Sequence, residues 1–225
     1  RWRERARTGR AVRRAGAADP IQLKFATADT TQDTSFRVGE RFGAEVAERT
    51  GGKYRVQMYV GGALGSTVNL GNSLQTGIVD CAILTSGYLE GFVPSIQVID
   101  LPFIFKDAPS AEKTLDGEVG RRLLAEMEAK NIIGLSWGWY GWRQLETRET
   151  AVQSAAEMRG LKIRVQPGPV FVAMFKELGA VPVVLDGSEV YLALSQKTVD
   201  AVDFPLPTAR TFKVYEVTKN LALTN

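Results

Sequence analysis

The chain contains no histidine and only one cysteine among its 225 residues. Without histidine, a Ser-His-Asp or Cys-His catalytic set and any histidine-ligated metal are excluded. With Cys81 alone there is no internal disulfide, so cysteine use says nothing about the redox compartment. No neighbouring residue activates the Cys81 thiol, which favours a small core residue over the alternative, a nucleophile.

Long hydrophobic runs are also missing, and none approaches the ~20 apolar residues of a membrane-spanning helix. Hydrophobic residues still make up 44% of the chain, enough for one large domain or two lobes. The net charge of +3 arises from residues 1–20, which hold seven arginines against Glu4 and Asp19. Because the rest of the chain is nearly neutral, we expect no nucleic-acid partner.

The basic segment 1–20 is poor in apolar residues, so we expect a disordered tail. It lacks the apolar stretch of a signal peptide, although "AGAAD" (Ala15–Asp19) resembles the small-residue end of a cleavage site. We therefore expect a leader peptide upstream that is not visible in this sequence.

After residue 20, strand patterns alternate with helix patterns, which predicts an α/β fold with largely parallel sheets. The predicted strands cover residues 21–27, 53–60, 79–84, 132–137, 161–165, 181–185 and 199–204. The predicted helices cover residues 34–50, 68–76, 109–130 and 170–178, with a further helix from Ser188. The glycine-rich segment Gly61–Ser66 lacks the lysine of a phosphate-binding loop and is interpreted as a tight connection.

Two segments align without gaps, "SLQTGIVDCA" (Ser73–Ala82) and "ALSQKTVDAV" (Ala193–Val202). Each has the pattern of a helix end, a turn and a strand, and the matched Asp80 and Asp200 are expected to play equivalent turn or capping roles. Two lobes built on one plan would leave a cleft between them, a common place for a small ligand. The alternative is a coincidence of local sequence pattern.

The stretch "GLKIRV" (Gly160–Val165) places an arginine near the end of a predicted strand. Ile163 and Val165 belong to one buried face, so Arg164 projects from the other, just before a Gln-Pro-Gly-Pro turn. Ligands of open α/β sheets bind beyond the carboxyl ends of strands, and the planar guanidinium pairs well with a carboxylate. The alternative is that Arg164 lies on a solvated strand face.

Two longer blocks carry a resemblance to a known family. They are "GGALGSTVNLGNSLQTGIVDCAILTSGYLEGFVPSIQVIDLPFIF" (Gly61–Phe105) and "MRGLKIRVQPGPVFVAMFKELGAVPVVLDGSEVYLALSQKTVDAVDFP" (Met158–Pro205). From Ile21 to Asn225 the chain resembles the substrate-binding proteins of TRAP transporters, the DctP family.

The resemblance implies a two-lobe periplasmic-binding-protein-like α/β fold, with a mixed, largely parallel sheet in each lobe and a ligand cleft between them. It divides the chain into lobe I, residues 21–140, and lobe II, residues 141–225. The family's C-terminal return strand and bracing helices are not found in the sequence, so we expect some exposed apolar surface.

The resemblance also implies a periplasmic receptor that binds a small organic acid and delivers it to a membrane permease. No cofactor, metal or catalytic residue is expected. The family's main carboxylate-binding arginine falls on Arg164, and a second one falls near Arg143. A sensing receptor of the same fold is an alternative. A carboxylate-processing enzyme is a weaker one, because Asp186, Glu189 and Asp203 suggest no paired acid and base, and Asp186 has the pattern of a helix N-cap.

The sequence departs from the family at the cleft. Phe204 stands where many members carry an asparagine, and Thr85 and Tyr88 replace charged residues of sugar-acid binders. Trp139 and Trp142 are further candidates for the lining. These residues predict a monocarboxylate ligand with an apolar or aromatic body. The alternative is that the aromatic rings only fill the core.

Overall fold

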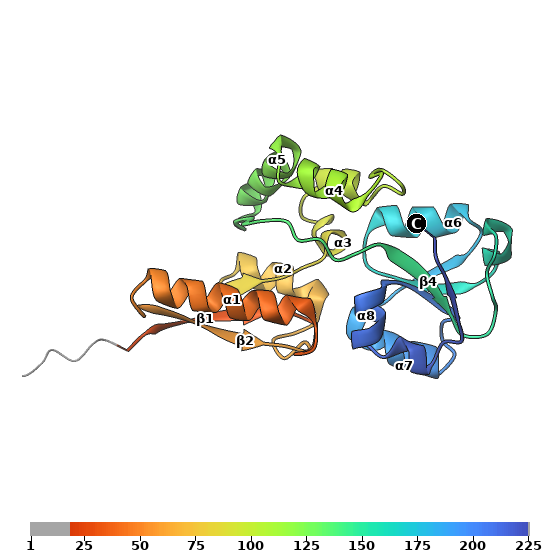
Figure 1. Ribbon diagram of the computed structural model, residues 1–225, viewed down its shortest axis with the longest axis horizontal. Helices are drawn as coiled ribbons and strands as arrows, with labels where there is room; N and C mark the ends of the chain where they lie inside the picture. The colour runs from red at the N-terminus through yellow and green to blue at the C-terminus, as the bar shows by residue number, and fades with distance from the viewer. Residues whose placement is uncertain (1–18, 225) are drawn as a thin grey trace, which may run out of the picture.

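The computed structural model describes residues 19–224, and the predicted tail therefore lies almost wholly outside the described residues. A three-stranded sheet of order β2-β1-β3 and a five-stranded sheet of order β6-β5-β7-β4-β8 lie side by side, each flanked by helices (Figure 1). The predicted two-lobe α/β fold is confirmed. We use lobe I and lobe II for the parts around these two sheets; the boundary at residues 140 and 141 stays a prediction.

Lobe I is a parallel sheet covered by helices on its faces. Asp33 begins the first helix, because its carboxylate accepts a hydrogen bond from the Ser35 amide at 3.2 Å. The elements are β1 (Ile21–Ala26), α1 (Thr34–Arg49), β2 (Tyr54–Tyr59), α2 (Thr67–Gln75) and β3 (Cys81–Ala82).

Lobe II is a mixed sheet. Strand β5 is parallel to β6 and β7, whereas β4 is antiparallel to β7 and β8. The strands are β4 (Arg143–Thr147), β5 (Lys162–Val165), β6 (Val181–Val184), β7 (Ala201–Pro205) and β8 (Asn220–Ala222). The helices are α6 (Pro169–Glu177), α7 (Val190–Ser195) and α8 (Leu206–Thr211), with 3-10 turns η3 (Ala155–Met158), η4 (Gly187–Glu189) and η5 (Val214–Glu216).

The repeat found in the sequence has a structural basis. Strands β6-β5-β7 repeat the order β2-β1-β3, and Asp80 and Asp200 hold equivalent positions before the third strand of each unit. The Lys24 amide donates to Asp80 Oδ2 at 2.7 Å, and the Lys162 amide donates to Asp200 Oδ2 at 3.0 Å. Each aspartate thus ties its turn to the middle strand of its own three-stranded unit, which confirms the predicted equivalence.

Two predicted elements are wrong in the segment between the sheets. The single helix over 109–130 is broken at Asp116 and Gly117. After the break Gly120 packs against the Leu115 carbonyl, and a Cβ at Gly120 would lie 1.7 Å from that oxygen. Residues 132–137 form no strand, and Ile133 is 75% exposed. The elements found are α3 (Ser86–Leu89), η1 (Pro94–Asp100), α4 (Ala108–Leu115), α5 (Glu118–Glu126) and η2 (Met127–Lys130).

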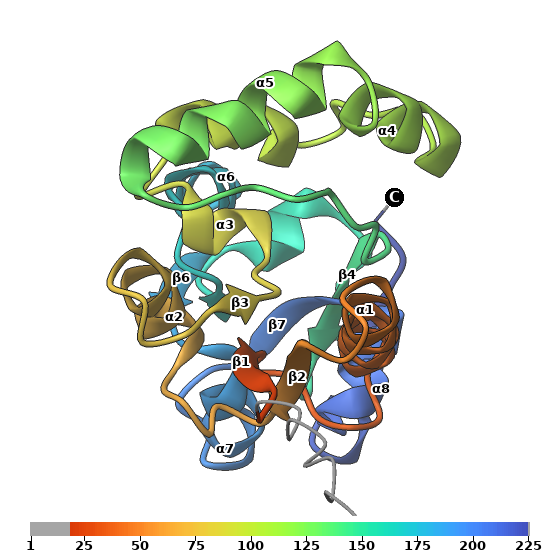
Figure 2. The same cartoon turned by 90° about the vertical axis from the view of Figure 1, so that its left-hand side faces the viewer.

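Helices α4 and α5 lie across one end of the molecule (Figure 2). Below them, α3 and η1 contact α6 of lobe II, so this segment forms part of the junction between the lobes. Among the helices of residues 19–224, none is both long and apolar enough to cross a membrane.

A buried carboxyl group lies at this junction. Glu90, directly after α3, is 1% exposed, and its Oε1 lies against Gly168 at the start of α6, where a Cβ would be 2.9 Å away. Burial, reinforced by the neighbouring Asp100, raises the pKa of Glu90 to about 8. Glu90 therefore keeps its proton at neutral pH in the folded protein.

We predict that Glu90 makes the fold less stable as the pH rises from about 5 to 8. The folded state binds a proton that the unfolded chain releases near its ordinary pKa, so the free energy of unfolding falls as the pH rises across this window. In Glu90→Gln the urea-unfolding free energy should lose much of this slope. The exposed control Glu118→Gln should keep the parental slope; equal slopes for all three proteins would contradict the assignment.

Candidate functional site

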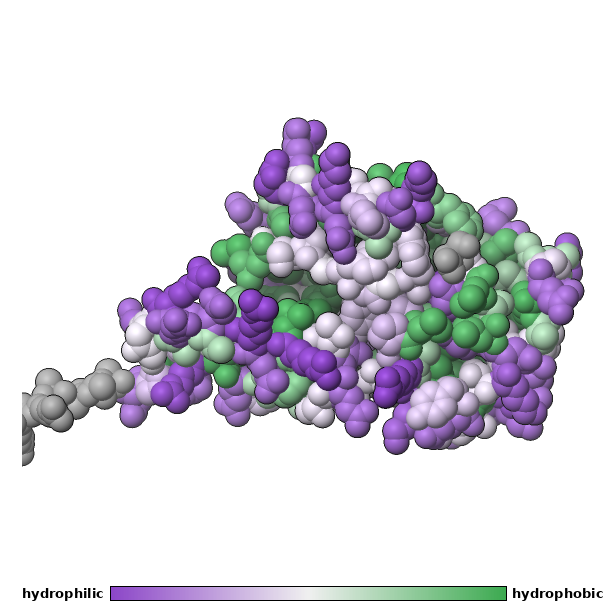
Figure 3. All heavy atoms as spheres, viewed as in Figure 1, coloured by the Kyte–Doolittle hydropathy of each residue, from purple (hydrophilic) through white to green (hydrophobic). Residues whose placement is uncertain are grey.

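A cavity of about 1950 Å³ lies between the two lobes. Hydrophobic residues gather in the hollow that the space-filling view shows between them (Figure 3). The cavity extends from the carboxyl ends of β5 and β7 to the apolar segment 101–105, so it is larger than a small ligand needs. All seven residues proposed from the sequence line it: Thr85, Tyr88, Trp139, Trp142, Arg143, Arg164 and Phe204.

Arg164 is buried, with 1% of its surface exposed, which rules out the solvated strand face. Its Nε and Nη2 donate to the Leu185 carbonyl at 3.0 and 2.8 Å, and Nη2 also donates to the Tyr88 hydroxyl at 3.3 Å. Burial lowers the pKa of Arg164. Within residues 19–224, no carboxylate forms an ion pair with this guanidinium, and no hydrogen bond uses Nη1.

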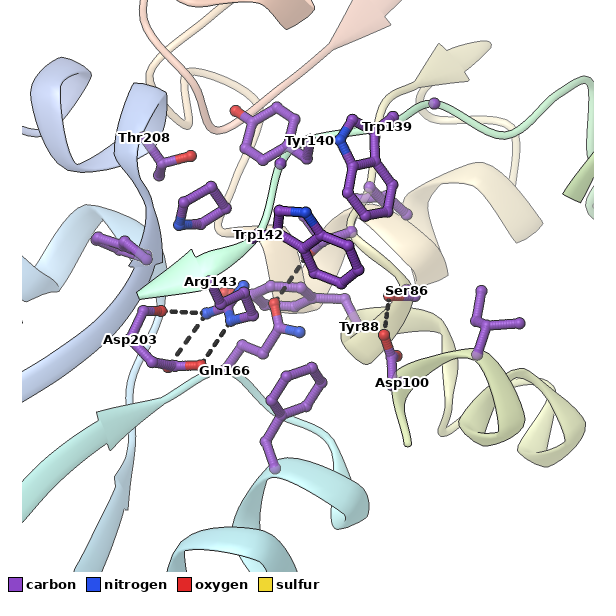
Figure 4. A pocket seen from close by; sticks show the side chains of 18 of the residues that line it. Ser86, Tyr88, Asp100, Trp139, Tyr140, Trp142, Arg143, Gln166, Asp203 and Thr208 are labelled. Atoms are coloured by element: carbon purple, nitrogen blue, oxygen red, sulfur yellow. Dashed lines mark hydrogen bonds and ion pairs between the residues drawn. The ribbon is translucent and has the colours of Figure 1, made fainter. Parts of the chain in front are cut away.

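Arg143, by contrast, is already paired. At the start of β4, its Nε lies 2.6 Å from Asp203 Oδ2 and its Nη2 lies 3.2 Å from Oδ1 (Figure 4). Burial acts to lower the pKa of Arg143, but the Asp203 carboxylate offsets this and the pKa is raised. Asp203 is 4% exposed and the Arg143 side chain 25%, so this is a bidentate ion pair with a buried carboxylate and a half-buried guanidinium.

A second carboxyl group lies behind this pair. Glu146 on β4 accepts a hydrogen bond from the Phe204 amide at 3.1 Å and is 4% exposed. Burial raises the pKa of Glu146 to about 8, and Asp203 adds to the effect. Because a protonated Glu146 carries no negative charge, Asp203 is the residue that neutralises Arg143.

Phe204 lies under the unpaired arginine. Its ring centre is 5.1 Å from the Arg164 guanidinium carbon, and the ring also stacks on Phe212 with a centroid distance of 5.7 Å. Phe204 is only 4% exposed, so most of its surface packs in the core, as the alternative stated for the aromatic residues expected. Phe204 therefore supports the guanidinium by a cation–π contact and offers the cavity no polar atom.

Lobe I supplies the facing wall. Tyr88 on α3 reaches Arg164, and Thr85 donates from its hydroxyl to Gln166 Oε1 at 3.0 Å, so both bond across to lobe II. Burial raises the pKa of Tyr88, which keeps its hydroxyl protonated. The segment leading into β4 adds Trp139 and Trp142, whose rings meet edge to face at 5.0 Å.

Several lining residues were missed by the sequence analysis. Gln166 lies two residues after Arg164, so strand alternation placed it on the same face and could have identified it. Asp203 was weighed only as an acid or base, and its pairing with Arg143 is a contact across 60 residues. Ser86 and Asp100, joined by a 2.7 Å hydrogen bond, gave no pattern in the sequence.

This arrangement suits binding rather than bond cleavage. Among the described residues, no group of three or more histidine, cysteine or acidic side chains could hold a metal ion. Cys81 lines the cavity as a partly buried free thiol, and burial raises its pKa, which favours the inert thiol. The unneutralised charge of Arg164 makes the cavity complementary to a small anion.

Comparisons with known proteins identify the family. Residues 25–225 match the family model described as bacterial extracellular solute-binding protein, family 7, or DctP. A solute-binding protein of Verminephrobacter eiseniae is 36% identical over 185 residues, which cover 82% of this chain and 55% of the relative. The chain spans 55% to 63% of the length of the first curated relatives.

Comparison with solved structures also finds solute-binding proteins. A TRAP periplasmic solute-binding protein from Bordetella bronchispeptica, with density interpreted as pantoate, matches with a TM-score of 0.87 at 34% identity, over 89% of this chain and 67% of that one. The sugar acid binding protein DctPAm of Advenella mimigardefordensis, in complex with galactonate, matches with a TM-score of 0.87 at 31% identity, over 91% and 66%. The resemblance seen in the sequence is confirmed, and the chain belongs to the DctP family of bacterial extracellular solute-binding proteins.

Proposed function

We propose that this protein is the periplasmic substrate-binding component of a TRAP transporter, capturing a small organic monocarboxylate between its lobes. The observation that carries the proposal is Arg164, a guanidinium 1% exposed that has no carboxylate partner within residues 19–224. A buried charge is unfavourable unless it is paired. A ligand carboxylate at Nη1 would supply the missing counter-ion.

The charges around the cavity favour a single carboxylate on the ligand. Arg143 brings no net positive charge, because Asp203 neutralises it. Of the other described residues that line the cavity, only Lys106 carries a positive charge, and it lies beside the apolar segment 101–105. A dicarboxylate would therefore leave its second charge without an equally close partner.

The body of the ligand is expected to be apolar or aromatic. Phe204, Trp142 and Phe171 give the lobe II side a largely aromatic wall. Relatives bind both kinds of acid, since one has density interpreted as pantoate, a hydroxy acid with two methyl groups, and another holds galactonate, which is polyhydroxylated. The comparisons support a carboxylate group on the ligand. The aromatic wall supports a ligand body that resembles pantoate more than a polyhydroxylated sugar acid.

Membership of the DctP family supports delivery to a permease and a periplasmic location. A sensing role for the same fold has no specific observation in its favour, and neither has an enzymatic one. The test is a thermal-shift screen against aromatic, branched-chain, dicarboxylic and sugar acids. A ligand at 100 times its Kd stabilises the folded state by ~2.7 kcal/mol. Failure of every acid to raise the melting temperature of a well-folded sample would contradict the proposal.

Removing the anchor should abolish most of the affinity. We predict that Arg164→Ala weakens binding of the best acid by roughly 100- to 3,000-fold, because the buried carboxylate loses a partner worth about 3–5 kcal/mol. Arg164→Lys should also bind poorly, since an ammonium cannot reproduce the planar fork. Calorimetric titration measures both.

The matched control is Arg159→Ala, which removes an exposed arginine of the same lobe. It should bind like the parent. Ligand-free melting curves separate loss of binding from loss of folding. An Arg164→Ala protein that folds, and whose Kd for the acid is within threefold of the parental value, would refute the assignment of Arg164 as the carboxylate-binding residue.

The aromatic wall can be tested at Phe204. We predict that Phe204→Asn weakens binding of a pantoate-like acid about tenfold, because the cation–π contact and the apolar surface are lost. Galactonate should lose less or gain, because the amide can bond a hydroxyl. The ratio of the two Kd values is the measurement. An unchanged ratio would show that Phe204 only fills the core.

A further inference from the structure

Within residues 19–224, at least three hydrogen bonds join the lobes around the cavity. Two have been described, from Thr85 to Gln166 and from Arg164 to Tyr88. In the third, the backbone N–H of Thr67 donates to Asp186 Oδ2 at 2.9 Å. Both Thr67 and Asp186 are 7% exposed, so this contact is largely shielded from water.

The third contact joins a carboxylate of lobe II to the N-terminus of a helix in lobe I. Thr67 is the first residue of α2, and Ser66, the N-cap, makes no side-chain capping bond. The first amides of a helix carry a partial positive charge and lack partners within the helix. Asp186 therefore supplies, from the other lobe, the cap that α2 lacks from its own sequence.

Asp186 is held rigidly in this position. Its Oδ1 accepts hydrogen bonds from the Ser188 amide at 3.1 Å and the Ser188 hydroxyl at 2.9 Å, and its own amide donates to Glu189 Oε2 at 2.9 Å. The N-cap role of Asp186 was predicted from the sequence and is confirmed. Because the surrounding bonds fix the side chain, little rotamer freedom is lost when Oδ2 meets α2.

The same segment also holds the carboxylate-binding arginine. The carbonyl that receives two N–H groups of Arg164 belongs to Leu185, the residue directly before Asp186. The position of the guanidinium and the contact with α2 are therefore set by two adjacent residues of one short connection.

We infer that Asp186 is a latch between the lobes, a positioning residue that sets how readily the cleft closes on its ligand. This inference rests on the proposed function for its effect on affinity, but the latch itself is a property of the two lobes. Opening the cleft breaks the contact with Thr67, whereas the capping bonds within lobe II persist. The latch therefore favours the closed arrangement and slows release of the ligand.

The structure offers a variant that removes the latch without touching Asp186. Thr67→Pro deletes the donating N–H at the first helical position, where proline is well tolerated. Ser66 already has φ −66° and ψ 159°, the conformation that a following proline requires. Asp186→Asn removes the charge from the other side. Asp107→Asn is the control, because Asp107 caps α4 within its own segment through a similar capping box.

The experiment measures the distance between the lobes and the release of ligand in the same set of proteins. Spin labels at Arg55→Cys and Lys176→Cys, exposed positions in different lobes, report the distance in a Cys81→Ser background. Without ligand, both latch variants should shift the distribution to longer distances, and the control should not. With pantoate or galactonate as the probe, both variants should raise the dissociation rate about tenfold and leave the association rate nearly unchanged.

A double variant completes a double-mutant cycle, which tests whether the two residues act through the same contact. If Asp186 and Thr67 act through one contact, Asp186→Asn with Thr67→Pro should be no worse than the more severe single variant. Additive effects, or a Thr67→Pro protein with parental distances and rates, would overturn the latch. If the distances shift as expected but neither acid binds the parent, the latch stands and the proposed function loses support. If an acid binds with unaltered distances and rates in the variants, the proposed function stands and the latch falls.

Discussion

The cleft depends on one buried positive charge that no carboxylate within residues 19–224 pairs with. Arg164 is 1% exposed and is held by a carbonyl and a hydroxyl, neither of which carries a full charge. A neighbouring carboxylate, Asp203, is occupied by Arg143. This distribution is costly in an empty cleft, because a buried cation loses its hydration. It makes sense in a molecule whose counter-ion arrives as a ligand and whose lobes then exclude water from the pair.

The duplicated architecture explains where the charge lies. Each lobe carries the same three-stranded unit, and the carboxyl ends of parallel strands form the natural ligand edge of such a sheet. Lobe II places Arg164 and Asp203 there, whereas lobe I contributes hydroxyl groups, those of Thr85 and Tyr88. The two halves have thus diverged in chemistry while Asp80 and Asp200 still perform the same structural task. The unpaired guanidinium comes from lobe II, and lobe I covers it.

The local sequence was enough to predict most strands and to place Arg164 near the end of one. The alternation of apolar and polar residues in a strand, and the turn residues after it, can be recognised within a few positions. Burial of Arg164 was not predictable in this way, since the covering groups, Phe204 and Tyr88, come from 40 and 76 residues away in sequence. The same limit explains the failed strand over 132–137, whose apolar residues lack a neighbouring strand to pair with among the described residues. The broken helix over 109–130 failed for another reason, because an amphipathic pattern continues across Asp116 and Gly117 although the backbone does not.

The pairing of Arg143 with Asp203 also bears on selectivity. Two nearby guanidinium groups could have formed a site for two carboxylates, and the sequence alone allowed that outcome. With Asp203 bound to Arg143 through two nitrogens and Glu146 protonated beside it, a second ligand carboxylate would have to displace a buried, bidentate partner. Displacement leaves Asp203 buried and unpaired, a penalty on the order of several kcal/mol. Under the proposed function, the ion pair between β4 and β7 would therefore act against dicarboxylates, whereas the neighbouring strand β5 presents the anchor Arg164.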